Sequence, residues 1–183
     1  MSIFRSSQEK QLWIYITIVV IIIFLTLFIG NPLREWLSNQ SLQAIYFLMG
    51  MFLVGATILA HGINLKPNKI ELAIWFGFTA MFLMFFLRLG LPERSHLIEY
   101  SVLTIFIHRA LSERFKTGKR LKPVLFALTL AFSIGVIDEA LQLIIPKRVF
   151  DPLDILFNGI VILMAIAGSE LLRWVRRKFI KTQ

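Results

Sequence analysis

Cysteine is absent from this chain of 183 residues. Its absence excludes disulfide bonds, a thiolate nucleophile and a zinc–thiolate site. The sequence also lacks a phosphate-binding loop, the Gly-x-Ser-x-Gly turn of serine hydrolases and the His-Glu-x-x-His pair of zinc peptidases. The familiar short signatures of enzymes are therefore missing, and function has to be sought in other patterns.

Acidic residues are few, 11 against 20 basic ones, which gives a formal charge of +9. Such a charge is typical of nucleic-acid-binding proteins when it covers one solvated face. Here the basic residues stand between long apolar runs instead. We therefore expect no nucleic-acid partner and interpret the charge as a signal of membrane topology.

Apolar residues dominate the chain, at 57% of the sequence with a mean hydropathy of +0.73. A soluble domain of this length cannot bury so much apolar surface. A membrane crossing needs about 20 apolar residues. The sequence therefore predicts an all-α integral membrane protein, a single domain over 1–183 with a bundle of six transmembrane helices. These are expected at about 12–30, 42–62, 72–87, 97–111, 123–145 and 153–172.

Two of these runs admit other interpretations. The first is longer than a signal-peptide core and is followed by Asn31-Pro32 rather than a small-residue cleavage pattern, so it is expected to be a retained anchor. The fourth is short and carries Glu99, His108 and Arg109, as a re-entrant segment would. Six crossings with the N-terminus inside put 15 of the 20 basic residues in cytoplasmic segments. This bias favours six crossings, with both termini in the cytoplasm.

In this topology, polar residues that are rare in membrane spans gather near the outer ends of the last three helices. They are Arg94, His96, Glu99, Asp138, Glu139, Gln142, Lys147, Arg148, Asp151, Asp154 and Asn158. Ionisable groups within a span cost about 2.5–3.5 kcal/mol each on insertion scales and often mark function. The sequence thus predicts one outward-facing polar pocket or cluster.

One helix face supports this convergence. Ala127, Ala131 and Gly135 form a row of small residues at four-residue spacing, which allows another helix to approach closely. Glu139 is the next residue on that row. Its side chain is therefore expected to face a neighbouring helix rather than lipid.

Several roles remain open for these residues. His96, Glu99, Asp138 and Glu139 are candidate general acid–base groups, although no nucleophile stands out. The others are candidate ligand-binding residues: Arg94, Gln142, Lys147, Arg148, Asp151, Asp154 and Asn158. Alternatively, the basic residues Arg94, Lys147 and Arg148 neutralise the acidic residues of this group in ion pairs that only hold the helix ends together. The pairs Asp151-x-x-Asp154 and His96-x-x-Glu99 carry metal-ligand atoms, but such short pairs are common by chance, so we expect no metal and no cofactor.

Polar residues at the inner helix ends are given simpler interpretations. His61 and His108 are expected to snorkel or to bond backbone carbonyls. The basic tail at 173–181 is interpreted as a topology signal that attracts anionic lipid, without a binding site.

The same outer-end motifs resemble a known family. The runs Arg94-Ser-His96-Leu-Ile-Glu99-Tyr100, Asp138-Glu139-Ala-Leu-Gln142 and Pro146-Lys-Arg148-Val-Phe-Asp151-Pro-Leu-Asp154, with Asn158-Gly159 after them, are similar to the VanZ-like membrane proteins over about 90–160. That family is named for a protein associated with resistance to the glycopeptide teicoplanin. The resemblance implies a bacterial-type plasma membrane and a link to the cell envelope, but no catalytic role for any residue.

Three functions compete at this point. The first is binding, or also modification, of a lipid-linked or phosphate-bearing envelope molecule, or of a glycopeptide, with Arg94, Lys147 and Arg148 meeting its negative charge. The second is a structural or partner-binding membrane protein. The third is transport, which is disfavoured because the inner halves of the last three helices show few polar groups that could continue a path.

Overall fold

The computed structural model describes residues 4–37, 45, 69–88, 91–116, 121–145 and 150–179. Within these ranges the chain is helical, with no strand. The five helices are α1 (Ser7–Leu37), α3 (Lys69–Arg88), α4 (Leu91–Arg114), α5 (Leu121–Gln142) and α6 (Pro152–Phe179). The helix expected at 42–62 lies outside the described residues, apart from the helical Ile45.

Three of these helices are long and apolar enough to cross a membrane. The qualifying segments are Ser7–Phe28, Leu121–Gln142 and Pro152–Val175. Their outward faces carry large apolar side chains, including Ile21, Leu25 and Phe28 of α1, which are about half exposed or more. Exposure of this kind along whole helices is unfavourable in water and suits a lipid environment. The all-α class and the membrane character predicted from composition are thus confirmed, whereas the number of crossings is not decided.

Helix α1 begins earlier than its apolar run because a capping arrangement starts it at Ser7. The hydroxyl of Ser6 accepts a 3.0 Å hydrogen bond from the backbone N–H of Glu9, and the Glu9 carboxylate accepts one of 2.7 Å from the N–H of Arg5. This is close to the reciprocal capping box of Ser-x-x-Glu sequences. At its other end the helix continues through Pro32 to Leu37, so the stop expected near Gly30 is wrong.

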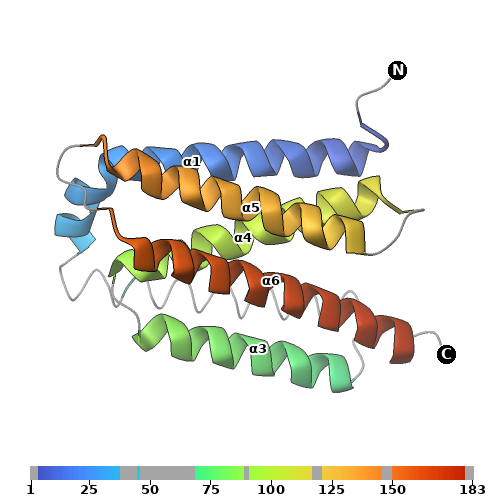
Figure 1. The fold of residues 1–183 in the computed structure, drawn as a ribbon. Coiled ribbons are helices and arrows are strands. Elements are labelled where there is room, and N and C mark those ends of the chain that lie inside the picture. The colour runs from blue at the N-terminus through green and yellow to red at the C-terminus, as the bar shows by residue number, and fades with distance from the viewer. Residues whose placement is uncertain are drawn as a thin grey trace.

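The fourth predicted helix is also longer than expected. It was predicted at 97–111 with a re-entrant alternative, and it is one continuous helix of 24 residues. Its low overall hydrophobicity has a packing reason: α4 lies in contact with α1, α5 and α6, and several of its polar side chains, such as Thr104 and His108, are buried among these helices (Figure 1). Leu103, Ile107 and Ala110 of α4 are completely buried in the core, against Ile16 and Ile23 of α1.

The helices alternate in direction across the bundle (Figure 1). Helices α1, α3 and α5 run one way, and α4 and α6 run the other. The start of α4, the end of α5 and the start of α6 consequently meet at one end of the bundle. The start of α1 and the end of α6 both lie at the opposite end of the bundle.

Candidate functional site

The small-residue row of α5 brings three helices close together, as the sequence predicted. Ala127, Ala131 and Gly135 are buried, and a Cβ built on Gly135 would stand 3.3 Å from Tyr100 Cε1 of α4 and 3.6 Å from Asn158 of α6. A side chain at this position would meet Tyr100 at a tighter than ordinary separation, so glycine allows the helices to approach most closely here. This contact sets the spacing of the polar residues that follow on each helix.

Polar side chains follow on these helices from Gly135 toward the end of the bundle where α5 ends. We call the following group the polar cluster: His96 and Tyr100 of α4, Asp138, Glu139 and Gln142 of α5, and Asp154 and Asn158 of α6. All are buried except Asp154, which is partly exposed. The expectation that Glu139 faces a neighbouring helix is confirmed, since its side chain is fully buried.

Within the polar cluster, Asp138 and Tyr100 form a defined pair. The Tyr100 hydroxyl donates a 3.0 Å hydrogen bond to Asp138 Oδ2, in a fully buried setting. The Tyr100 ring stacks on the His96 imidazole one turn earlier, with 5.9 Å between ring centroids and 5° between planes. Tyr100 therefore ties α4 to α5 and orients His96, a role that the sequence analysis did not assign to it.

His96, Glu139 and Asp154 meet at the centre of the cluster. One ligand atom from each lies within 4.8 Å of the others, and His96 Nε2 is 3.9 Å from Glu139 Oε1. The backbone N–H of Asp151 also interacts with the Glu139 carboxylate, yet neither carboxylate oxygen completes a hydrogen bond with a described donor. A charged group so placed is costly unless a partner joins it.

Asn158 is a second buried group without a partner. It is only 1% exposed, and neither its amide nitrogen nor its amide oxygen makes a hydrogen bond to any described residue. A buried amide left in this state costs about 1–3 kcal/mol. Native structures retain such groups rarely, so Asn158 and Glu139 together mark the cluster as incomplete without a polar partner.

The other residues that the sequence singled out do not belong to the polar cluster. The Asp151 carboxylate accepts a 2.9 Å hydrogen bond from the N–H of Leu153, so it caps the start of α6. Glu99 is partly exposed and is not one of the three residues that meet at the centre. The group that the fold brings together, His96 with Glu139 and Asp154, joins residues of three helices that spacing along one helix could not connect. Lys147, Arg148 and the side chain of Arg94 lie outside the described part of the chain.

The opposite end of the bundle holds a second set of polar side chains. His108 is completely buried with its Nε2 3.1 Å from Glu170 Oε1, and Arg173 Nη1 lies 3.2 Å from the same oxygen. The expectation that His108 snorkels or bonds a carbonyl is therefore wrong. Polar side chains also continue along α4 toward this end, since Ser101, Thr104 and His108 are all buried.

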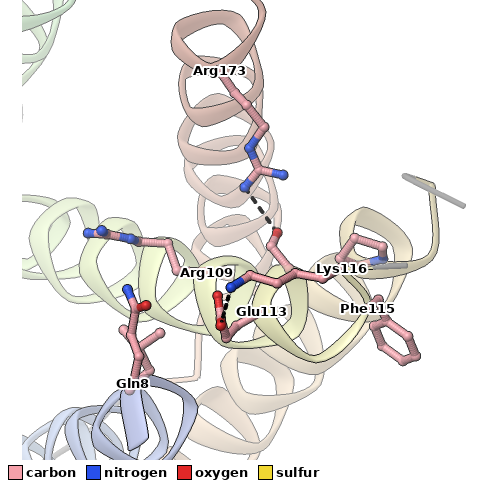
Figure 2. Close-up of a pocket in the computed structure, with 9 residues that line it drawn as sticks. Gln8, Arg109, Glu113, Phe115, Lys116 and Arg173 are labelled. Carbon is pink, nitrogen blue, oxygen red and sulfur yellow. Dashed lines mark hydrogen bonds and ion pairs between the residues drawn. The ribbon is translucent and has the colours of Figure 1, made fainter. Parts of the chain in front are cut away.

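A cavity of about 400 Å³ opens beside this second set. Figure 2 shows Arg109, Glu113 and Lys116 at the end of α4, Gln8 at the start of α1, and Arg173 reaching from α6 to the Ser112 hydroxyl. The basic tail thus takes part in a structured contact at its first residue. Both polar sets could have been predicted from the sequence. Polar residues recur at four-residue spacing along one face of α4, at His96, Tyr100, Thr104, His108 and Ser112.

Comparison with known proteins identifies no relative. No protein-family model, no curated protein and no solved structure matches this chain.

Proposed function

We propose that this chain is a six-crossing protein of a bacterial-type plasma membrane, with both termini cytoplasmic. Two observations support this topology. The start of α1 and the end of α6 lie at the same end of the bundle, as an even number of crossings requires. That end also carries several basic residues, in the manner of cytoplasmic segments: Arg5, Arg109, Arg114, Lys116 and Arg173. The polar cluster then faces the outer leaflet.

In this orientation the polar cluster binds the polar headgroup of a lipid-linked or phosphate-bearing envelope molecule. The observation that carries the proposal is the unsatisfied pair at its centre, the Asn158 amide and the Glu139 carboxylate. An amide offers both a donor and an acceptor, and a carboxylate accepts from hydroxyl or amine groups. Arg94, Lys147 and Arg148, which are near His96, Asp151 and Asp154 in the sequence, would supply positive charge for a phosphate. The resemblance to VanZ-like proteins agrees with an envelope role linked to teicoplanin.

Acid–base chemistry on the headgroup is a compatible extension of binding. His96 stands 3.9 Å from Glu139, and the adjacent Asp138 is already held by Tyr100. A histidine next to an unpaired carboxylate is able to pass a proton between itself and a bound hydroxyl. His96 and Glu139 are therefore the pair that would act in an enzymatic version, with Asp138 and Tyr100 as positioning residues.

The Asn158→Leu variant tests the proposal, because leucine has the same branching and number of heavy atoms as asparagine and removes both unpaired polar atoms. Removal of an unsatisfied buried amide should leave folding stability unchanged or raised. Binding should be measured as retention of a polyprenyl phosphate, phosphatidylglycerol or phosphatidylcholine on the purified protein by native mass spectrometry. We expect the wild type to retain a phosphate-bearing lipid over phosphatidylcholine, and Asn158→Leu to lose that preference.

Thr129→Val provides the matched control. Thr129 is exposed on α5 and its hydroxyl bonds only to the Leu125 carbonyl of its own helix. This variant should retain lipid like the wild type. Equal retention of all three lipids by the wild type, or undiminished preference in Asn158→Leu, would overturn the proposed function. Teicoplanin susceptibility of a host that expresses each variant gives a second readout, in which only Asn158→Leu should differ from wild type.

A further inference from the structure

Three helices each contribute one metal-ligand atom to the centre of the polar cluster. They come from His96 of α4, Glu139 of α5 and Asp154 of α6, all within 4.8 Å of one another. Around a bound divalent ion with bonds of about 2.1 Å, neighbouring ligand atoms lie about 3.4 Å apart in a tetrahedral site. The observed 3.9 Å between His96 Nε2 and Glu139 Oε1 needs only a small side-chain rotation to reach this separation.

The charge of this centre points to a cation. Asp138, Glu139 and Asp154 bring three carboxylates to the cluster, the first two buried and Asp154 partly exposed, and both oxygens of the fully buried Glu139 lack a hydrogen bond from the described residues. A buried carboxylate in this state is stabilised by a positive partner, and a metal ion supplies two charges at once.

The other end of the bundle shows the contrast. There, the same two helices α4 and α6 provide His108 and Glu170, but the third member is Arg173, whose Nη1 lies 3.2 Å from Glu170 Oε1. That histidine–glutamate pair carries its own cation. At the polar cluster the third member is a further carboxylate, Asp154, where the other end has an arginine.

We propose that His96, Glu139 and Asp154 bind one divalent transition-metal ion of the Mn²⁺ or Zn²⁺ class. An imidazole nitrogen with two carboxylates suits such ions better than Mg²⁺ or Ca²⁺, which prefer oxygen ligands alone. Three protein ligands leave at least one coordination position open. This inference rests on the proposed function in one respect: the open position would receive a phosphate oxygen of the headgroup, which reconciles an acidic cluster with an anionic ligand.

The test uses the full chain, purified in detergent and stripped of metal with a chelator. Titration with MnCl₂, followed by calorimetry and by the Mn²⁺ paramagnetic resonance signal, should show one saturable site per chain. Glu139→Gln and Asp154→Asn should each weaken binding at least about tenfold, which is about 1.4 kcal/mol. MgCl₂ at the same concentration should not compete.

Glu170→Gln is the matched control, because it alters the second histidine–glutamate pair and leaves the cluster intact. His61→Ala controls for adventitious binding elsewhere. Both should bind Mn²⁺ like the wild type. Absence of saturable Mn²⁺ binding to the wild-type chain would by itself overturn the metal site. A loss of Mn²⁺ affinity in Glu170→Gln as large as that in Glu139→Gln or Asp154→Asn would overturn it too.

Lipid retention separates this inference from the proposed function. Saturable Mn²⁺ binding in a protein that retains no phosphate-bearing lipid would uphold the metal site and overturn headgroup binding. Retention of a polyprenyl phosphate that needs Mn²⁺ and is lost on chelation would support both. Retention that is unchanged after complete chelation would overturn the proposed bond between the metal and the phosphate.

Discussion

Tyr100 of α4 donates a hydrogen bond to Asp138 of α5 across 3.0 Å, and both side chains are buried beside the Gly135 contact. The bond lies where the small-residue row of α5 ends and the acidic residues begin. It therefore couples the packing of the two helices to the placement of the polar cluster.

The first prediction concerns this bond. Tyr100→Phe keeps the ring and removes the donor to Asp138 Oδ2, which should destabilise the protein by about 1–3 kcal/mol, because a buried acceptor loses its partner. Thermal unfolding in detergent measures the effect. Tyr15→Phe, on the exposed face of α1, is the control and should melt like the wild type. Equal melting of the two variants would contradict a buried, stabilising bond.

A second prediction concerns the pair that joins the start of α1 to the end of α4. Arg114 Nη1 lies 3.2 Å from Glu9 Oε1, and the Glu9 side chain is fully buried. Arg114→Leu should cost about 1–3 kcal/mol of stability, since it leaves a buried carboxylate without its cation, although the partial exposure of Arg114 limits the loss.

Lys116→Leu is the comparison for that experiment. Lys116 pairs with Glu113 at a more exposed position, so its removal should change stability by less than about 0.5 kcal/mol. The difference between the two midpoints of thermal unfolding is the informative quantity. A loss in Lys116→Leu as large as that in Arg114→Leu would argue against burial of Glu9 as the cause.

Gly135 provides the third prediction. Gly135→Leu should destabilise the protein by about 1–3 kcal/mol or more, because the new side chain meets Tyr100 and Asn158 within 4 Å of its Cβ. Gly77→Leu in α3 adds the same side chain where nothing lies within 4 Å of the Cβ, and should be tolerated. Indistinguishable melting of the two variants would show that α4, α5 and α6 do not approach as closely as described.

The fourth prediction tests the proposed topology. The chain has no cysteine, so single cysteines are unambiguous labels. In intact cells an impermeant thiol reagent should label Val149→Cys, between α5 and α6, and spare Gly118→Cys, between α4 and α5, until the membrane is permeabilised. Labelling of Gly118→Cys from outside would overturn the placement of both termini in the cytoplasm.

The sequence by itself determined the helical class, the membrane character and the face on which Glu139 lies. Composition decides the first two, because 57% apolar residues leave a chain of this length few other environments. Four-residue spacing decides the third, since the period of a helix places Gly135 and Glu139 on one side. The Ser6-Ser7-Gln8-Glu9 pattern also contains the capping signal that starts α1 at Ser7. The prediction placed this start later, at about residue 12, because it followed the apolar run.

Only the tertiary structure decided which polar residues meet. Spacing placed His96 beside Glu99 and Asp151 beside Asp154; the fold brings His96 together with Glu139 and Asp154, and it places Asp151 as a helix cap. It also buried Glu9 and paired His108 with Glu170 at the opposite end. The physical reason is that sequence period fixes the side of a helix on which a residue stands, but contacts between helices depend on their relative rotation and register. Those are set by packing across the whole bundle, here by the close approach at Gly135.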